Sequence, residues 1–318
     1  MNKITRIGCI GAGLVGRGWA TLFSSAGYEV ILYDMNADVL EEALRQIRSD
    51  LMFLETNALL PKNETERSMK RIKMTGVLAE AVDNAGYIQE SVFDNYDSKK
   101  KIFKEMDAIA PQSTILSSST SGLLMTEIQK AVAMPERCVL AHPYLPVHLM
   151  PLVEVVGGRQ TEAGALTATC GLMEKIGKTP VLLKREVSGF IVNRLQAALL
   201  REAIDLVDSG VASAEEVDKA YCLSAGLRGP LMGPLLRAHL AGDGIERFFT
   251  NYSQSYRARW ESMATWHAIS PRAENANIKS VNEMKVVRTK SLDEIKSWRD
   301  ENLVKILRII REGAHCGC

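Results

Sequence analysis

Short apolar runs alternate with segments of helical period from the N-terminus to Lys184. The runs are rich in Val, Ile and Leu and are bounded by Gly, Pro or polar residues, which is typical of strands. The predicted strands are Arg6–Ile10, Glu29–Tyr33, Tyr87–Ser91, Ser113–Leu116, Cys138–Ala141, Pro151–Val156 and Thr179–Leu183. The predicted helices between them are Leu14–Ala26, Ala37–Leu59, Ser98–Ile109 and Glu162–Ile176. This alternation predicts a parallel sheet with helices on both faces.

From Val187 onwards the periodic segments are almost all helical. Apolar residues of the segment Phe190–Asp208 recur on one face of a helix. Ser213–Glu216 has the spacing of a capping box that opens a further helix, and Ile245–Met263 and Leu292–Glu312 also have helical patterns. The change predicts an all-α second domain, whose apolar helix faces suit either a core or a dimer interface.

A glycine-rich turn joins the first predicted strand to the first predicted helix. It carries the spacing G-x-G-x-x-G at Gly11, Gly13 and Gly16. These glycines suit a tight turn, the close approach of a pyrophosphate to backbone, and the packing of helix on strand. The first helical turn, with Leu14 and Val15, offers N–H groups and the positive end of the helix dipole to phosphates.

Asp34 ends the second predicted strand, at the position where an acid binds the ribose 2′-hydroxyl of a dinucleotide. No Arg or Lys follows it directly to hold a 2′-phosphate, so the sequence predicts NAD rather than NADP as the cofactor. Together these features predict an α/β fold, with a Rossmann-type dinucleotide-binding domain over residues 1–186. A helical domain for substrate binding or dimerisation would follow over residues 187–318.

Composition and charge narrow the class of protein. The chain has 318 residues and a formal net charge of +1, so nothing indicates a nucleic-acid partner. Basic runs such as Ser98–Lys101 have acids nearby and are predicted to be solvated helix faces. No apolar run approaches the roughly 20 residues of a membrane helix. The N-terminus enters a strand almost at once, which argues against a signal peptide.

The six cysteines have the spacing of neither a disulfide framework nor a zinc site. His315, Cys316 and Cys318 form a short tail that has no further metal ligands nearby in the sequence. We therefore expect no metal and a reducing, cytoplasmic location.

Two predicted strands in the stretch Cys138–Gly158 each contain an ionisable group. His142 follows the first run, and Glu154 lies in the middle of the second. A carboxyl group in an apolar strand is costly unless it is paired, and a His–Glu pair between neighbouring strands would satisfy both groups. A carboxylate also orients an imidazole and raises its basicity, as in a general base. The alternative is a structural His at a strand end, with Glu154 bonded to backbone.

Other polar residues lie where ligands bind in such folds. Glu90 and the run Ser117–Ser121 end predicted parallel strands, although serine-rich ends are also common in turns. Asn193 has apolar neighbours and either reaches a cleft or lies on the solvent face of its helix. Arg228 precedes a Gly/Pro turn, and it is either a solvated cap or a bidentate clamp for a substrate carboxylate.

With these residues in place, the chain resembles the L-3-hydroxyacyl-CoA dehydrogenase superfamily over nearly its whole length. The resemblance rests on the order and separation of GAGLVG, QES, SSSTSG, His142 followed by PLVEVVGG, and GFIVNRL. Within the superfamily it is most similar to the branch that holds lambda-crystallin (L-gulonate 3-dehydrogenase) and L-carnitine dehydrogenase. The motif AHP, Ser119 in place of Asn, GLR at Gly226–Arg228 and the terminal RDENL support that placement.

The resemblance implies a role for each matching residue. It makes His142 the general base and Glu154 its orienting partner, with Ser121 and Asn193 bonded to the reacting oxygen and to the His. It places Glu90 near the nicotinamide ribose, Ser119 at the cofactor and Arg228 at the carboxylate of a free acid. One departure is clear, because Leu145-Pro146 stands where the family usually has Asn-Pro.

The expected activity is the NAD-dependent oxidation of a small L-3-hydroxy acid, such as L-gulonate, to the 3-keto acid by a homodimer. One alternative is a short-chain L-3-hydroxyacyl-CoA dehydrogenase. A second is an L-carnitine dehydrogenase, for whose trimethylammonium group Tyr144, Trp260 and Trp266 are available. A third, from a different class, is a non-catalytic NAD-binding structural protein of the crystallin type.

Overall fold

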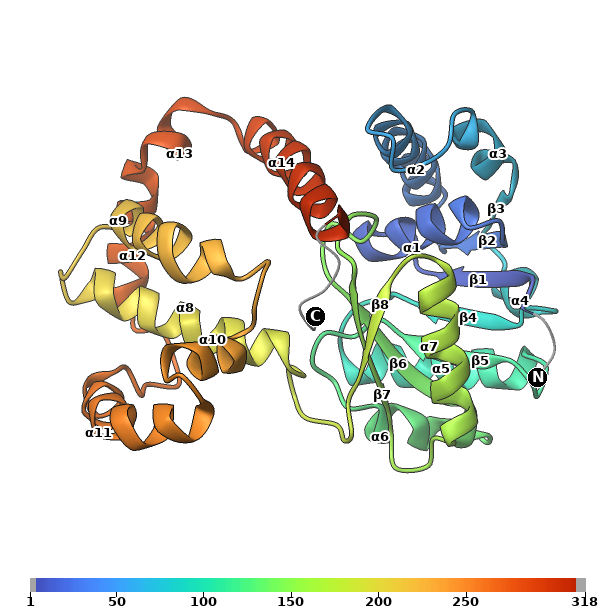
Figure 1. The fold of residues 1–318 in the computed structure, drawn as a ribbon. Coiled ribbons are helices and arrows are strands. Elements are labelled where there is room, and N and C mark those ends of the chain that lie inside the picture. Colours follow the sequence, from blue (N-terminus) through green and yellow to red (C-terminus); the bar gives the residue numbers. More distant parts are fainter. Residues whose placement is uncertain (1–3, 313–318) are drawn as a thin grey trace. The chain divides into compact units, whose positions relative to one another are not determined.

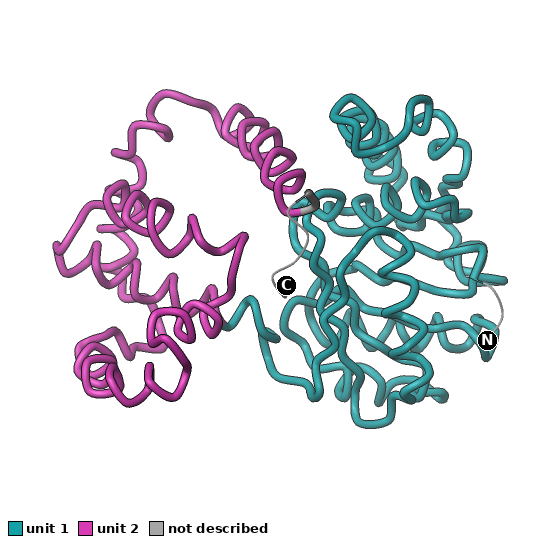
Figure 2. Tube along the Cα trace, viewed as in Figure 1, with its two compact units in different colours: residues 1–194 teal, residues 195–318 magenta. Residues whose placement is uncertain are grey.

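The computed structural model of the protein describes residues 4–312 and contains two compact units. Unit 1 comprises residues 1–194 and unit 2 residues 195–318 (Figure 2). The division falls inside a helix, whereas the domain boundary proposed from sequence lies after residue 186. The tail with His315, Cys316 and Cys318 lies outside the described residues.

Unit 1 is built on one eight-stranded sheet (Figure 1). Its strands are β1 (Arg6–Ile10), β2 (Glu29–Tyr33), β3 (Ile72–Thr75), β4 (Tyr87–Glu90), β5 (Ile115–Ser118), β6 (Cys138–Pro143), β7 (Leu152–Gly157) and β8 (Thr179–Leu182). Their order is β3-β2-β1-β4-β5-β6-β7-β8, and each neighbouring pair is parallel except β6–β7. The first six strands in this order have the arrangement of a Rossmann sheet, which confirms the predicted fold class.

Helices cover both faces of this sheet. They are α1 (Leu14–Ser25), α2 (Ala37–Thr56), α3 (Glu64–Lys70), α4 (Leu78–Val82), α5 (Tyr96–Ile109), α6 (Met125–Ile128) and α7 (Ala163–Lys175), with 3₁₀ turns at Gln129–Ala131 and Pro135–Arg137. Buried side chains of α1, α2 and α7 form one apolar core with one face of the sheet. Those of α4, α5 and α6 form a second core with the opposite face.

Alternation along the strands assigns each side chain to one of these cores. In β6, Val139 and Ala141 belong to the first core, and Cys138 and Leu140 belong to the second. Successive strand residues point to opposite faces. His142 therefore continues the row that begins with Cys138 and faces the side of the sheet that α5 and α6 cover.

Three short elements of unit 1 carry too little pattern to predict. The segments α3, β3 and α4 have between four and seven residues, and β3 is an edge strand with exposed positions. The helix α2 ends at Thr56, three residues before its predicted end, and Ala58 beyond it has a φ of 54°. A left-handed residue of this kind cannot continue a right-handed helix.

Unit 2 is helical. Its helices are α8 (Val192–Asp208, whose first three residues belong to unit 1), α9 (Ala214–Tyr221), a π-helix (Cys222–Gly226), α10 (Pro234–Ala241), α11 (Ile245–Ser262), α12 (Pro271–Glu283), α13 (Lys285–Thr289) and α14 (Leu292–Glu312). Ser213 caps α9 by accepting from the Glu216 amide at 3.3 Å, as the capping-box spacing predicts. The helix α8 starts two residues later than predicted, because Phe190 has a φ of 49°.

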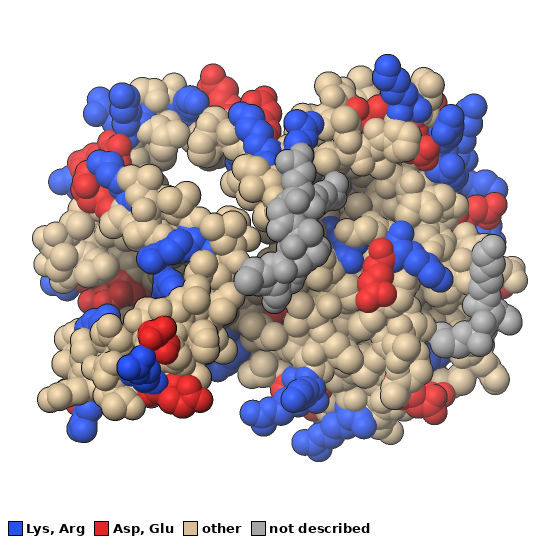
Figure 3. Space-filling model, viewed as in Figure 1, with Lys and Arg blue, Asp and Glu red and all other residues tan. Residues whose placement is uncertain are grey.

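Two kinds of feature are absent from residues 4–312. None of their helices is long and apolar enough to cross a membrane. No group of three His, Cys, Asp or Glu side chains among them is placed to hold a metal ion. Basic and acidic side chains both occur over the face of each unit drawn in Figure 3.

Candidate active site

The glycine-rich turn after β1 leaves no room for side chains at two of its three glycines. A Cβ at Gly11, where φ is 97°, would lie 2.8 Å from the carbonyl oxygen of Ser91. A Cβ at Gly16 would lie 1.8 Å from the carbonyl oxygen of Gly11. At Gly13, by contrast, no heavy atom lies within 4 Å of an added Cβ. The backbone is therefore tight behind the turn and open in front of the first turn of α1.

Asp34 lies beside this turn at the end of β2. Its Oδ2 accepts from the Ala12 amide at 2.9 Å, and its Oδ1 accepts from the Asn36 amide at 3.0 Å. The first amides of a helix, here those of Leu14 and Val15, have no acceptor within the helix. Free N–H groups beside open space and an adjacent fixed carboxylate can hold a pyrophosphate and a ribose hydroxyl, so the residues present fit a dinucleotide.

The antiparallel pairing of β6 and β7 brings His142 directly opposite Glu154. The Nδ1 atom of His142 lies 3.1 Å from Oε2 of Glu154. The two residues are 5% and 1% exposed, respectively. The predicted contact between the strands is therefore present, and it satisfies two polar groups in an otherwise apolar part of the sheet.

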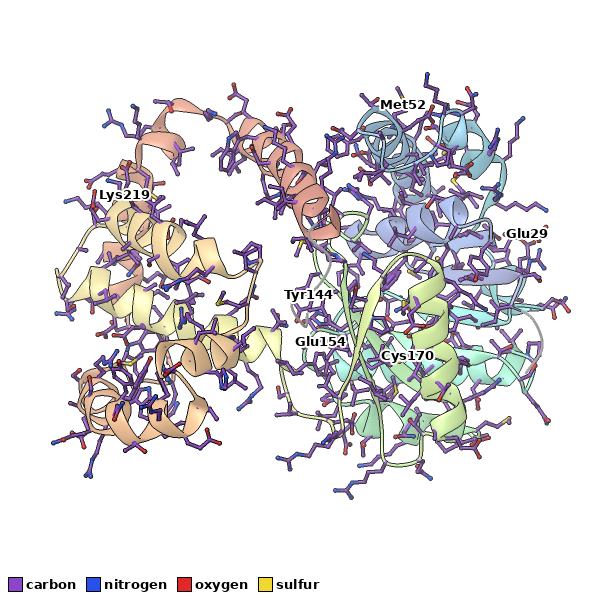
Figure 4. The ribbon with its side chains drawn as sticks, viewed as in Figure 1. Glu29, Met52, Tyr144, Glu154, Cys170 and Lys219 are labelled. Atoms are coloured by element: carbon purple, nitrogen blue, oxygen red, sulfur yellow. The ribbon has the colours of Figure 1, made fainter. Side chains whose placement is uncertain are left out.

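Glu154 accepts three more hydrogen bonds. Its Oε2 accepts from the hydroxyl of Tyr144 at 2.7 Å, and its Oε1 accepts from the amides of Ile191 and Val192 at 2.9 and 3.1 Å. Figure 4 labels Tyr144 and Glu154. Burial alone raises the pKa of Glu154, but the hydrogen bonds from His142, from Tyr144 and from the two amides hold it below its usual value. The carboxylate therefore makes the contacts of both interpretations, since it pairs with the His and also bonds to backbone.

These contacts determine which nitrogen of His142 carries the proton. An ionised carboxylate only accepts hydrogen bonds, so Nδ1 of His142 must donate to Glu154. In the neutral ring Nε2 then keeps its lone pair and can accept a proton. Such an arrangement suits a carboxylate-oriented general base, and the catalytic role of His142 stays a prediction.

Ser121 and Asn193 are hydrogen-bonded to each other, and within the part of the chain that the structure describes neither is hydrogen-bonded to His142. The side-chain amide of Asn193 donates to the carbonyl oxygen of Ser121 at 3.0 Å. The hydroxyl and the amide of Ser121 both bond to Oδ2 of Asp94, at 3.0 and 3.3 Å. Asn193 directly follows the two amides that Glu154 holds, so the pair Ser121–Asn193 and the pair His142–Glu154 are connected through the start of α8.

Glu90 is fully buried at the end of β4, and its carboxylate is already paired. Nζ of Lys99 lies 2.8 Å from Oε1, the Ser118 hydroxyl donates to Oε2 at 2.6 Å, and the Val92 amide donates to Oε1 at 2.6 Å. The carboxylate is thus enclosed by its partners within the protein. The role of Glu90 in cofactor binding stays a prediction.

The prediction that the run Ser98–Lys101 is a solvated helix face is wrong for Lys99, which is 1% exposed. Lys99 shares the buried stripe of α5 with Phe103 and Met106. Its position on that stripe, with an acid at the end of a preceding strand, was the signal that could have identified the buried ion pair with Glu90.

Ser119 lies at the centre of a polar cluster behind the glycine turn. Its Oγ accepts from Nε1 of Trp19 at 3.0 Å and from Nε2 of Gln89 at 2.7 Å, and it lies 2.8 Å from Oγ of Ser91. A hydroxyl that accepts two bonds has one hydrogen left to donate, and this hydrogen points to Ser91. The cluster fixes the backbone next to Gly11, while direct contact between Ser119 and a cofactor stays a prediction.

The remaining candidate residues lie on the surface. Arg228 is exposed in unit 2, and its Nε donates to the carbonyl oxygen of Ser224 at 3.2 Å. Leu145 is 49% exposed and brings no polar atom of its side chain to the segment between β6 and β7.

Sequence reasoning missed the part that Tyr144 and Asp94 play in these clusters. Tyr144 lies two residues after His142, a spacing that in a strand puts both side chains on one face. Asp94 lies in the loop after β4, at the edge where the parallel strands end. These positions were the available signals, whereas the partners themselves come from distant segments.

Two family models match the chain, one to each part. Residues 6–187 match the NAD-binding domain of 3-hydroxyacyl-CoA dehydrogenase, and residues 189–280 match its C-terminal domain. A lambda-crystallin homolog from Mus musculus is 36% identical over 302 residues, which cover 93% of each chain. An L-carnitine dehydrogenase from Streptomyces coelicolor is 34% identical over 309 residues, which cover 96% of this chain and 95% of the relative.

A solved structure is similar over almost the whole fold. It is that of 5-formyl-3-hydroxy-2-methylpyridine 4-carboxylic acid 5-dehydrogenase, an NAD+-dependent dismutase. It has a TM-score of 0.82 and 26% identity, and the match covers 97% of this chain and 99% of that one.

Proposed function

This chain belongs to the 3-hydroxyacyl-CoA dehydrogenase family and is an NAD-dependent dehydrogenase, and from that premise we propose that it oxidises a small free L-3-hydroxy acid, L-gulonate or a related acid, to the 3-keto acid. The observation that carries the proposal is the buried His142–Glu154 pair, in which Nε2 of the imidazole is left to act as a base. An intact pair of this kind favours catalysis over a purely structural role.

We assign the proton transfer to His142. The bound NAD supplies the hydride acceptor. Nε2 of His142 removes the hydroxyl proton of the substrate, and Glu154 stabilises the imidazolium that forms, because its carboxylate is hydrogen-bonded to Nδ1. Ser121 and Asn193 position the substrate oxygen in this proposal, since they are connected to the pair through the start of α8. In the reduction of the keto acid, the imidazolium returns the proton.

A free carboxylate on the substrate requires a cation, and we assign this part to Arg228. Its exposed guanidinium has one hydrogen bond to backbone and keeps further donors for a ligand. The dehydrogenase of the similar solved structure is likewise named for a carboxylic acid. A CoA thioester would be neutral at the corresponding end, which is why the free acid is the preferred substrate class.

Replacing Arg228 by Met is expected to raise KM for the free acid by about 10–100-fold, the worth of a charge-assisted hydrogen bond. The methyl ester of the same acid should change far less, because it has no charge for the arginine to bind. Initial rates on the acid and ester, compared in both proteins, measure the difference. Arg257→Met, at an exposed arginine of α11 paired with Glu261, is the control, and equal effects of Arg228→Met on acid and ester would contradict the assignment.

The substrate itself is tested with a panel of acids followed by NADH absorbance. The panel holds L-gulonate, L-carnitine and 3-hydroxybutyrate, with acetoacetyl-CoA assayed in the direction of reduction. Turnover of the thioester alone would favour the acyl-CoA alternative, and turnover of L-carnitine alone would favour the carnitine alternative. No turnover of any compound by a protein that binds NADH would favour a structural role. In the same assay NADP should be used poorly, because the carboxylate of Asp34 repels a 2′-phosphate.

We also propose that the protein is a cytoplasmic homodimer that associates through unit 2. Large apolar side chains of its helices are exposed, among them Leu199 and Leu200 of α8 and Phe249 and Trp260 of α11, with exposed fractions between 45% and 63%. Exposed apolar surface on this scale is typical of an interaction site. Sedimentation equilibrium of the full chain should give twice the monomer mass, and a monomer at micromolar concentration would contradict the proposal.

A further inference from the structure

Tyr144 and the proposed general base His142 are hydrogen-bonded to the same carboxylate oxygen of Glu154. Its hydroxyl donates to Oε2 of Glu154 at 2.7 Å, and the same oxygen accepts from Nδ1 of His142 at 3.1 Å. The two rings also meet edge to face, with centroids 4.7 Å apart and an interplanar angle of 68°. Tyr144 thus contacts both members of the pair.

The direction of the hydrogen bond from Tyr144 is fixed by its partner. An ionised carboxylate only accepts hydrogen bonds, so the hydroxyl hydrogen of Tyr144 is directed to Oε2 of Glu154. Burial, followed by the hydrogen bond to Glu154 and the charge of that carboxylate, raises the pKa of Tyr144. The phenol therefore stays protonated and remains a donor over the working range of a dehydrogenase.

We propose that Tyr144 is a positioning residue that divides the charge of Glu154 between two donors and thereby sets the pH at which His142 exchanges its proton; this rests on the proposed function. The physical reason is competition at one oxygen. A second short hydrogen bond to Oε2 stabilises the carboxylate whether or not the imidazole is charged, and so leaves less of its charge to stabilise an imidazolium.

Groups other than Tyr144 lie near the pair on two sides. On the α8 side are the amides of Ile191 and Val192, which bond to Oε1, and the apolar ring of Phe190, whose centroid is 5.3 Å from that of His142. Towards β5, the same face of the sheet carries the Glu90–Lys99 ion pair and Asp94.

One further titratable group lies beneath the segment that carries Tyr144. Lys178 donates to the carbonyl oxygens of Val147 and Met150, and burial lowers the pKa of Lys178 to about 7. Its titration contributes equally to the wild type and to a variant at position 144. The difference in midpoint between the wild type and the variant therefore reports the effect of the Tyr144 hydroxyl alone.

Tyr144→Phe keeps the ring against His142 and removes only the hydroxyl. Without the second donor, Glu154 favours the imidazolium more, so the acid-limb midpoint of kcat/KM for oxidation should rise by about 0.5–1 unit. Reduction of the keto acid, which needs the imidazolium, should persist to a pH higher by the same amount. The variant should therefore oxidise the substrate more slowly than the wild type at acidic pH, and it should reduce the keto acid faster than the wild type at alkaline pH. If Tyr144 had only a structural role, its replacement would lower the rates of oxidation and of reduction together at every pH.

The midpoint can also be measured without a substrate. NMR titration of the imidazoles, with His142 assigned by comparison with His142→Gln, should show the same upward shift in Tyr144→Phe. Tyr28→Phe, at a half-buried tyrosine near the end of α1, is the matched control and should show no shift. Unmoved midpoints, or parallel losses in both directions at every pH, would overturn the proposal.

Two further outcomes are distinguishable. If Tyr144→Phe does not fold, a fluorinated tyrosine at this position, a stronger donor of the same shape, should move the midpoint down, and an unmoved or raised midpoint would count against the proposal. If no acid in the panel is turned over but the NMR midpoint still moves, the proposed function fails and the coupling between Tyr144 and His142 stands.

Discussion

His142→Gln is expected to lower kcat/KM by about 10²–10⁴-fold in both directions, the usual contribution of a positioned general base. Glutamine is close to histidine in reach, and its amide can still donate to Glu154, so the carboxylate keeps a partner. Its side chain cannot take up a proton near neutral pH, so the step assigned to Nε2 is lost. Steady-state rates by NADH absorbance measure the effect.

Cofactor binding separates loss of chemistry from loss of structure in this variant. The glycine turn joins β1 to α1, and Asp34 directly follows β2. The hydrogen bonds that hold Asp34 come from Ala12 and Asn36 rather than from His142. The Kd for NADH should therefore stay within about threefold of the wild type, well under the 1.4 kcal/mol of a tenfold change. His239→Gln, at an exposed histidine of α10, should leave both rate and binding unchanged. Wild-type turnover in His142→Gln would remove His142 from the mechanism.

The pairing of β6 with β7 could be predicted because a buried carboxyl group needs a partner and few groups in the sequence can supply one. A carboxyl group in the middle of the run Leu152–Gly157 needs a partner, and the strand nearest in sequence ends with an imidazole. The glycine-rich turn was equally predictable, because its glycines follow one another at fixed spacing. In the structure, the space around Gly11 and Gly16 admits no Cβ.

The rest of the Glu154 network could not be predicted, because its members have no local relation in sequence. The amides of Ile191 and Val192 are 37 and 38 residues away from Glu154, and they reach it only through the turn in which Phe190 adopts a positive φ. For a phenylalanine this backbone conformation is rare, and no propensity indicates it. The predicted helix therefore began at Phe190, so the sequence did not indicate that the amides of Ile191 and Val192 are free to bond to Glu154.

The wrong prediction for Lys99 has a different cause, because it relied on the local excess of lysines and not on the position of Lys99 in the helix. A cluster of three lysines in Ser98–Lys101 is typical of a solvated helix face. Lys99 is nevertheless on the apolar stripe, one turn before Phe103, and its charge is neutralised by Glu90. A lysine at that position is buried only because the carboxylate lies at the end of the adjacent strand.

Glu154→Gln is expected to lower both activity and stability. The four donors that surround Glu154 suit an acceptor with two oxygens, and an amide offers one oxygen and one NH₂ group. If its oxygen keeps the amides of Ile191 and Val192, its NH₂ faces Nδ1 of His142. The proton then moves to Nε2, which abolishes the lone pair that the base needs. A wrong tautomer of this kind costs about 10⁴-fold in kcat in a serine protease, and we expect a loss of about 10²–10⁴-fold here.

The stability of this variant should depend on pH in a defined way. The hydroxyl of Tyr144, a half-buried residue, loses its acceptor, and a donor left without a partner in this way costs about 1 kcal/mol of unfolding free energy. Because the pKa of Glu154 is held below its usual value in the folded state, the carboxylate contributes stability above the unfolded value of about 4.3 and loses it as the pH falls through the folded value. The difference in unfolding free energy between the wild type and Glu154→Gln should therefore be largest at pH 7 and should decrease below about pH 4.

Urea unfolding of both proteins at pH 7 and at pH 3.5 measures this difference. Glu29→Gln, at an exposed residue of β2 whose carboxylate lies 4.0 Å from the guanidinium of Arg6, is the control and should change the unfolding free energy by less than about 0.5 kcal/mol. A difference that stays constant with pH would show that the loss comes from packing alone. The same carboxylate bonds both to His142 and to the amides of Ile191 and Val192. A pH-dependent difference in stability accompanied by loss of turnover would therefore connect the base to the start of α8 through a single side chain.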